Sequence, residues 1–223
     1  MSKPKIVVLT GAGMSAESGL KTFRDENGLW EGHDVMEVAS PQGFARNPQL
    51  VLEFYNQRRK QLLEVAPNPG HIALAQLEQA FDVSIVTQNV DNLHEQAGSS
   101  HVIHLHGELL KVRSTMDKNH VLDWETDLVL GDTDPNGHQL RPHIVWFGEM
   151  VPMLEIAAQI TQQAEILIIV GTSMQVYPGQ IPIYFIDPRP NIRSSDFENL
   201  TVIPKTAAQG VPYLVEELLN NWL

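Results

Sequence analysis

Four short segments in this chain combine glycines or polar side chains with a position directly after an apolar run. They are GAGMSAES from Gly11, TQNVD from Thr87, HLHG from His104 and GTS from Gly171. Open α/β sheets bind ligands just outside the carboxyl ends of their parallel strands. Four such strand ends therefore predict a single site assembled from distant parts of the sequence.

The first segment has the spacing of a dinucleotide-binding loop. Gly11, Gly13 and Ala16 fit the pattern G-x-G-x-x-G/A, in which missing side chains let backbone N–H groups approach a pyrophosphate. A dehydrogenase would place a second strand and an acidic ribose ligand about twenty residues later. Here Phe23 and Arg24 follow almost at once, so the loop predicts a dinucleotide but not a hydride-transfer enzyme.

The TQNVD segment follows an apolar run and carries Gln88, Asn89 and Asp91. Amide and carboxylate groups at a strand end can bind ribose hydroxyls or a nicotinamide amide. A polar turn with an Asx hydrogen bond is the alternative, and the pattern alone favours it.

The HLHG segment places His104 and His106 two residues apart, so on a strand they would share a face, and Gly107 permits a sharp turn. An imidazole near its ordinary pKa can take a proton from a hydroxyl at neutral pH, which makes one of them a candidate base. A hydrogen-bonded structural histidine is the commoner reading of such a residue. A metal pair is disfavoured because no nearby residue obviously completes the site.

Three further segments carry weaker signals. Gly171, Thr172 and Ser173 suit a phosphate or ribose but equally a helix N-cap. The run RPHIVWFGE from Arg141 ends in a Trp-Phe-Gly edge to which an extended peptide could add as a strand. Tyr55 and Arg58 lie three apart and so on one helix face, where a phenol and a guanidinium could bind a carboxylate; a solvated helix surface is the alternative that the pattern favours.

Length and composition narrow the class of protein. The 223 residues suit one large domain, or one domain with a smaller insertion, and there is no cysteine for a disulfide or thiolate site. The formal net charge of −12 disfavours a nucleic-acid backbone as partner, and no apolar run approaches the length of a membrane span. We expect an unprocessed, cytoplasmic and monomeric protein.

The pattern of elements predicts an α/β fold: a Rossmann-like parallel sheet with helices on both faces, plus a smaller inserted domain. We assign residues 1–32, 81–108 and 141–223 to the first, and 33–80 and 109–140 to the second. The segment between Gly32 and Ala80 is expected to be helical, and Leu109 to Leu140 polar and irregular. The expected strands are Ile6–Thr10, Val83–Thr87, Val102–Leu105, His143–Trp146, Ile166–Val170, Ile183–Ile186 and Thr201–Ile203.

Taken together, GAGMSAESG with TFR after it, TQNVD, HLHG, RPHIVWFGE and GTSMQVYP closely resemble the signature blocks of sirtuins, the NAD-dependent protein-lysine deacylases. The blocks span Gly11 to Pro178, so the resemblance covers most of the chain. It implies NAD as a consumed co-substrate and acylated lysine side chains of proteins as partners. A catalytically inactive NAD- or ADP-ribose-binding module is the alternative.

The resemblance also implies residue roles. The amide oxygen of the acylated lysine would attack the anomeric carbon as nicotinamide leaves, and His106 would then act as base, with Asn89 and Asp91 as the other catalytic residues. Val145, Phe147 and Gly148 would line the lysine tunnel, and the pair Tyr55 and Arg58 resembles the signature of the branch that removes succinyl and malonyl groups. The implied NAD contacts are Gly11, Ala12, Gly13, Ser15, Phe23, Arg24, Trp30, Gln88, Asn89, Val90, Asp91, Gly171, Thr172, Ser173, Asp187 and Ala207.

Two features depart from the family. Most sirtuins bind zinc through two Cys-x-x-Cys pairs, whereas here the corresponding positions are Ser114 and about Asp117, with the second pair falling in Asp132–His138. We therefore predict a zinc-free module with Trp124 as an anchor. The connection from Val170 to Ile183 is also short for a helix-bearing crossover, either through a true deletion or because residues are missing from the sequence.

Overall fold

The computed structural model describes residues 2–20, 29–30, 32–172 and 180–222. Its largest element is a six-stranded parallel sheet with strand order β11-β10-β9-β1-β4-β5. The order reverses between β1 and β9, which is where a doubly wound sheet opens a crevice for ligands. The strands are β1 Lys5–Thr10, β4 Asp82–Thr87, β5 Val102–His104, β9 Ile166–Val170, β10 Ile183–Ile186 and β11 Leu200–Ile203.

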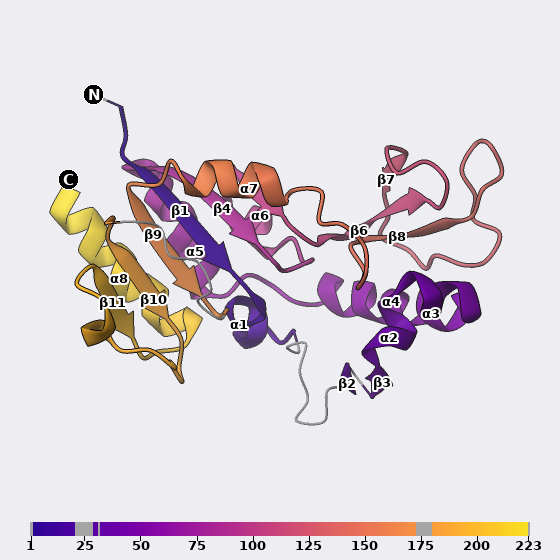
Figure 1. Ribbon diagram of the computed structural model, residues 1–223, viewed down its shortest axis with the longest axis horizontal. Helices are drawn as coiled ribbons and strands as arrows, with labels where there is room; N and C mark the ends of the chain where they lie inside the picture. The colour runs from indigo at the N-terminus through magenta and orange to yellow at the C-terminus, as the bar shows by residue number, and fades with distance from the viewer. Residues whose placement is uncertain (1, 21–28, 31, 173–179, 223) are drawn as a thin grey trace.

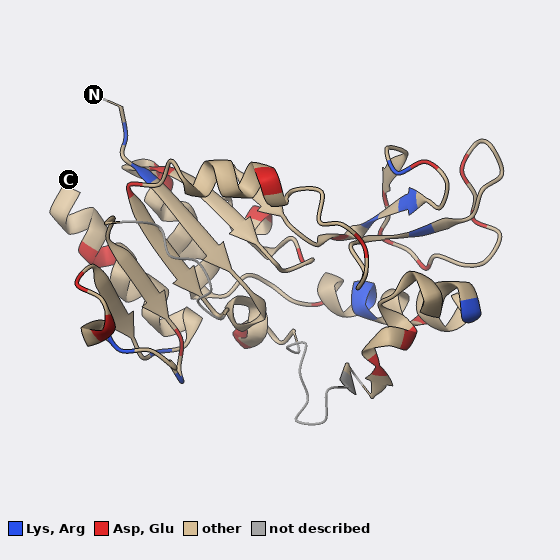
Figure 2. Cartoon of the chain, in the orientation of Figure 1, with Lys and Arg blue, Asp and Glu red and all other residues tan. Residues whose placement is uncertain are grey.

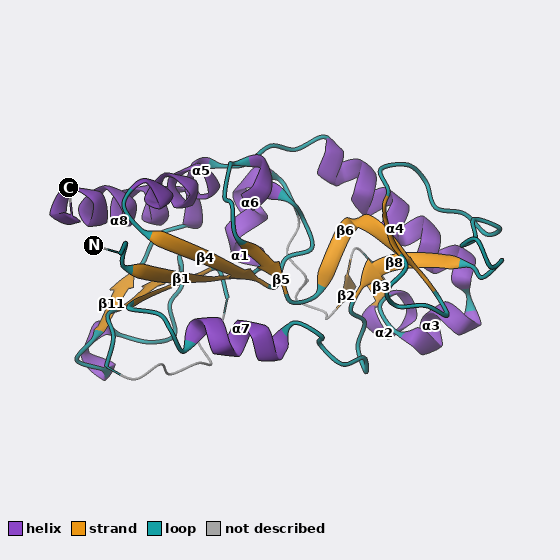
Figure 3. Cartoon of the chain, turned by 90° about the horizontal axis from the view of Figure 1, so that it is seen from above, coloured by secondary structure: helices purple, strands orange, loops and turns teal. Residues whose placement is uncertain are grey.

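The apolar runs form central strands because both faces of this sheet are covered by helices (Figure 3). On one face, α5 (Pro69–Gln76) and α8 (Ala207–Trp222) pack on residues such as Ile6 and Val8. On the other face, α7 (Leu154–Thr161) packs on Val7 and Leu167. The predicted parallel sheet with helices on both faces is confirmed.

A smaller module lies beside the carboxyl ends of the strands (Figure 1). Helix α4 (Pro48–Leu63) begins at Asn47, whose side chain accepts a hydrogen bond from Leu50 N, as the Asn-Pro signal predicts. It packs against a three-stranded antiparallel sheet in the order β7-β6-β8. The other elements here are β6 Gly107–Ser114, β7 Val121–Asp123, β8 Leu140–Ile144, α2 Val35–Val38 and α3 Pro41–Arg46.

Two expectations about this module were wrong. The strand expected at His143–Trp146 begins earlier, as Leu140–Ile144, and pairs antiparallel with β6 instead of joining the parallel sheet. The stretch from Leu109 to Leu140 contains most of β6 and all of β7, so it is more regular than expected. The apolar pattern of the sequence predicts that a strand is present but not which strand it pairs with, because the partner lies far away along the chain.

The remaining elements are short and lie mostly at the ends of the sheet strands. The short elements are α1 Ala12–Ser15, α6 Leu93–Gln96, β2 Leu29–Trp30, β3 His33–Asp34 and the 3-10 turns Ala16–Ser18, Leu77–Gln79 and Ser194–Asp196.

Charged residues are scattered over both the large sheet and the smaller module (Figure 2). No helix in the described part of the chain is long and apolar enough to cross a membrane.

Candidate active site at the sheet edge

Two glycine loops meet at the point where the strand order reverses. Gly11 N donates to Val170 O at 3.1 Å, and Gly13 N donates to Gly171 O at 3.0 Å. A Cβ on Gly13 would lie 2.6 Å from Gly171 Cα, and Gly171 has φ of +62°. Only glycine permits this approach, so the two loops pack backbone to backbone at the point where the strand order reverses, and this arrangement fits a dinucleotide.

The strand ends of β4 and β9 are joined by side chains across the same crevice. Gln88 Nε2 donates to Thr172 Oγ1 at 3.1 Å. The parallel register, which pairs Thr10 with both Thr87 and Val170, brings these ends level. The predicted convergence of the GAG, TQNVD and GTS segments is therefore present.

A buried hydrogen-bond network connects the first two segments. Ser15 Oγ donates to Asp91 Oδ2 at 2.9 Å and accepts from Asn89 Nδ2 at 3.1 Å. Asp91 also accepts from Leu93 N at the start of α6. Burial raises the pKa of Asp91, although both hydrogen bonds oppose that shift. The carboxylate is thus held where its charge is poorly solvated.

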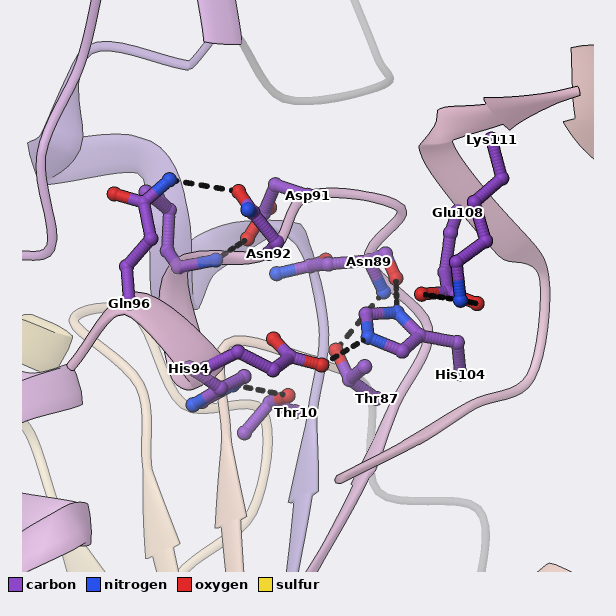
Figure 4. A network of polar contacts seen from close by, with 12 residues as sticks. Thr10, Thr87, Asn89, Asp91, Asn92, His94, Gln96, His104, Glu108 and Lys111 are labelled. Atoms are coloured by element: carbon purple, nitrogen blue, oxygen red, sulfur yellow. Dashed lines mark hydrogen bonds and ion pairs between the residues drawn. The ribbon is translucent and has the colours of Figure 1, made fainter. Parts of the chain in front are cut away.

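The two histidines of HLHG bind successive backbone carbonyls of the TQNVD segment. His106 Nδ1 lies 3.0 Å from Gln88 O. His104 Nδ1 lies 3.0 Å from Asn89 O, and Figure 4 shows this second contact. A carbonyl only accepts, so each Nδ1 carries the proton. In the neutral ring of His106 this contact places the lone pair on Nε2, which is the arrangement that a general base requires.

The predicted peptide edge is connected directly to His106. Val145 N donates to His106 O at 2.8 Å, and Phe147 N donates to Ala39 O at 2.9 Å. Phe147 is exposed and Gly148 adopts φ of +87°. Val145, Phe147 and Gly148 thus lie along one segment that leads away from the candidate base.

Two arginines and one glutamate hold that segment in place, and sequence reasoning missed them. Glu149 binds Arg141 at 2.7 Å and Arg113 at 3.2 Å, and it accepts from Trp146 N. The Arg141 guanidinium also lies 3.3 Å from the centre of the Trp146 ring. The signal was available in RPHIVWFGE, whose first and last charged residues form the ion pair.

Tyr55 is fully buried, and its hydroxyl accepts a hydrogen bond from Trp146 Nε1 at 3.0 Å. Burial raises the pKa of Tyr55, with a small opposing effect from the Arg58 charge, so the phenol stays neutral. Arg58 lies over the Phe54 ring at 4.4 Å. The two predicted residues are therefore close together, next to the segment that carries Val145 and Phe147.

Other predicted contacts are spread around this centre. Phe23, Arg24 and Ser173 lie outside the described residues. Ala12 opens α1, and Val90 O accepts a hydrogen bond from Leu109 N. The ring of Trp30 packs on Phe54 and Tyr55. The carboxylate of Asp187 accepts a hydrogen bond from Arg189 N. Ala207 is buried at the start of α8.

The positions that correspond to zinc ligands in the family bind each other instead. Ser114 Oγ donates to Asp134 Oδ2 at 2.7 Å and accepts from the backbone N of Met116 and Asp117. Asp134 also accepts from Asn136 N, His138 N and His138 Nδ1. Within the described ranges, no group of three or more His, Cys, Asp or Glu side chains could hold a metal ion. These residues do not fit zinc, and its absence stays a prediction.

Comparisons with known proteins agree with this geometry. The Sir2 family model matches residues 11–178. An NAD-dependent protein deacylase of Helicobacter pylori is 55% identical over 96% of this chain and 97% of its own length, and one of Bacteroides thetaiotaomicron is 50% identical with the same coverage. A solved complex of a Sir2 homolog with NAD has a TM-score of 0.86 and 35% identity, covering 99% of this chain and 91% of the other.

Proposed function

The chain belongs to the Sir2 family, and we propose that its sheet-edge site makes it an NAD-dependent protein-lysine deacylase. The observation that carries the proposal is the tautomer of His106. Its Nδ1 donates to Gln88 O, so the lone pair of the neutral ring lies on Nε2, and Gln88 directly precedes Asn89 of the Asn89 and Asp91 network. The names of the two bacterial relatives support the same activity.

The chain's own residues have separate tasks. NAD, when bound, supplies a ribose carbon that loses nicotinamide and accepts the acyl oxygen of the lysine, so that the acyl group ends on ADP-ribose. The glycine loops bind the pyrophosphate through backbone N–H groups other than those of Gly11 and Gly13, which already donate to the neighbouring loop. Asn89 and Asp91 hold the nicotinamide and ribose, and the Asp91 carboxylate stabilises positive charge that develops there. His106 Nε2 takes the proton from a ribose hydroxyl.

We further propose that the acyl group includes acidic chains such as succinyl and malonyl. Trp146 donates to the Tyr55 oxygen, which leaves the phenolic proton free to be donated to a carboxylate. The raised pKa of Tyr55, caused mainly by burial, keeps that proton in place at neutral pH. Arg58 supplies the positive charge and two parallel donors.

A product assay distinguishes the deacylase from an inactive NAD-binding module. The protein is incubated with NAD and acetyl- or succinyl-lysine peptides, and the products are identified by mass spectrometry. A deacylase releases nicotinamide and O-acyl-ADP-ribose in equal amounts. Binding of NAD without either product would establish the inactive module instead.

The acyl preference is tested with the variants Tyr55→Phe and Arg58→Met. Tyr55→Phe removes one donor to the acyl carboxylate, and Arg58→Met removes two donors with their charge. Hydrogen bonds to charged groups contribute about 1.5–3 kcal/mol, so kcat/KM for succinyl peptide should fall about 10- to 100-fold in Tyr55→Phe and at least as much in Arg58→Met. Activity on acetyl peptide should change far less. Lys60→Met is the matched control, because Lys60 lies on the same helix, is exposed and pairs with exposed Asp127. Full desuccinylation by the double variant contradicts the assignment.

A monomer, a cytoplasmic location and the absence of nucleic acid as a partner stay predictions from composition. The acidic net charge of −12 supports lysine-rich protein segments as substrates. Gel filtration of the full chain tests the first of these predictions.

A further inference from the structure

The histidine that precedes the candidate base by two residues has a different set of partners. His104 Nδ1 lies 3.0 Å from Asn89 O, and its Nε2 lies 2.7 Å from Glu95 Oε1. The His104 side chain is only 7% exposed. Both ring nitrogens of His104 therefore have a partner within hydrogen-bond distance, and the ring itself is largely shielded from water.

The chemistry of these partners determines the protonation state of His104. A peptide carbonyl and an ionised carboxylate can only accept hydrogen bonds, whereas a neutral imidazole has a single N–H. Both contacts are satisfied only when both ring nitrogens carry protons. The contact of His106 with Gln88 O requires only one ring N–H, so the two histidines of one motif have different hydrogen-bonding requirements.

The position of His104 connects this charge to the reaction centre. Its Nδ1 holds the carbonyl of Asn89, whose side-chain amide donates to Ser15 Oγ. Its Nε2 holds Glu95 on α6, the helix that begins immediately after Asp91. Figure 4 shows His104 against the Asn89 backbone, with Asp91 on the same loop. One side chain therefore holds both the loop that carries Asn89 and the helix that follows it.

We propose that His104, held as an imidazolium by Glu95, is a positioning residue that fixes Asn89 and Asp91 in their reactive arrangement. The proposal rests on the deacylase assigned above, and it adds a residue to which the family signature gives no role. His104 does not touch the substrate. It acts through the Asn89 carbonyl and through its charge, which partly opposes the rise that burial causes in the pKa of Asp91.

The electrostatic surroundings support this state. Burial by itself lowers the pKa of His104, but the hydrogen bond and charge of Glu95, the Asn89 carbonyl and the charge of Glu108 together raise it above its ordinary value. The pKa of Glu95 is lowered: its own burial opposes that shift, and the hydrogen bond and charge of His104 outweigh the burial. The charged and titratable groups that act on the pair are Asp91 in the loop, His94 on α6, and Glu108 and Lys111 on β6.

The raised pKa of His104 determines how the ion pair with Glu95 depends on pH. The ion pair is complete below the ordinary histidine pKa and is lost as the pH rises through the higher folded-state pKa. Activity should therefore decline on the alkaline side as His104 loses its proton. In Glu95→Gln, the carboxamide keeps an acceptor but removes the charge, so this alkaline decline should move to lower pH.

The direct test is a pH titration of the full-length protein followed by NMR of the histidine ring nitrogens. We expect both ring nitrogens of His104 to be protonated at pH 7 and the Asn89 side-chain amide signal to shift at the same midpoint. Glu95→Gln should lower that midpoint, because it removes the carboxylate charge that raises the pKa of His104. A neutral His104 ring at pH 7 overturns the proposal, and this readout is independent of whether the protein proves to be a deacylase.

The kinetic test uses His104→Ala and Glu95→Gln, with His101→Ala as the matched control. His101 lies just before β5, at the opposite end of that strand from His104, and its ring bonds Ser84 Oγ at 2.9 Å, so loss of the ring should leave the rate unchanged. We expect His104→Ala to lower kcat about tenfold with little change in KM for the acyl peptide, and Glu95→Gln to shift the alkaline limb of the kcat profile. Rates within twofold of the parent and an unshifted profile in both variants also overturn the proposal.

Discussion

Two buried aspartates, one in each part of the molecule, are held in opposite ways. Asp91 at the sheet edge accepts two hydrogen bonds, from Ser15 and Leu93, and burial raises its pKa. Asp134 in the antiparallel module accepts four hydrogen bonds. Its pKa is lowered, and the hydrogen bond from Ser114 is the largest cause. A buried carboxylate that accepts few hydrogen bonds can still stabilise a cationic ligand, as we expect for Asp91. A carboxylate that accepts many, such as Asp134, stabilises the fold instead.

The sharpest test of this contrast is Asp91→Asn. Removing preorganised charge from a reacting centre typically costs about 100- to 1,000-fold in kcat, and we expect a loss of that size in deacylation. Thermal stability should stay the same or rise, because a carboxyl whose pKa is raised on folding makes its ionised form unfavourable at neutral pH.

Asp82→Asn is the matched control for that variant. Asp82 is exposed at the amino end of β4, so the same substitution there should alter neither rate nor Tm. A lower Tm for Asp91→Asn, measured by calorimetry, would contradict a purely functional role for that carboxylate.

The converse substitution is Asp134→Asn, which should lower Tm by several degrees while leaving the rate per folded molecule unchanged. Because the pKa of Asp134 lies below its ordinary value in the folded state, its stabilisation is complete above about pH 4 and is lost as the pH falls below that. The difference in Tm between parent and variant should therefore be constant near neutrality and shrink in acid. Asp117→Asn, which removes the charge of an exposed aspartate that caps one turn, should show neither effect.

A smaller effect is expected for Ser114→Ala. The Ser114 hydroxyl joins two turns by donating to Asp134 and accepting from Met116 N and Asp117 N. Its loss removes one donor from buried Asp134 and one acceptor from two backbone N–H groups, and should reduce the free energy of unfolding by about 1–3 kcal/mol, measured by urea denaturation. An unchanged midpoint would mean that Asp134 is held by its own turn alone.

The smallest expected effect is that of metal removal. Since Ser114 and Asp134 are bonded to each other, dialysis against a chelator should leave both Tm and activity unchanged. Metal analysis of the purified protein is the accompanying measurement. Stoichiometric zinc would show that the module is held by coordination and not by the Asp134 network.

Much of the fold was predictable because the buried strands are continuous apolar runs, and because Asn47-Pro48 and Asn68-Pro69 mark helix starts. The partner of β8 was not predictable. The antiparallel pairing of β8 with β6 joins segments about thirty residues apart, and nothing in either segment specifies that contact. The convergence of the strand ends was predictable in outline, since parallel strands bring their carboxyl ends to one edge.

The sequence by itself determined which residues are available to the site: the glycines that permit close backbone approach, the polar strand ends and the paired histidines. Only the tertiary structure decided what each one does. His104 and His106 are the same residue type on the same motif, yet one contacts a carbonyl and a carboxylate while the other contacts a carbonyl alone. Charge state depends on partners brought together by folding, and the amino-acid order does not state them.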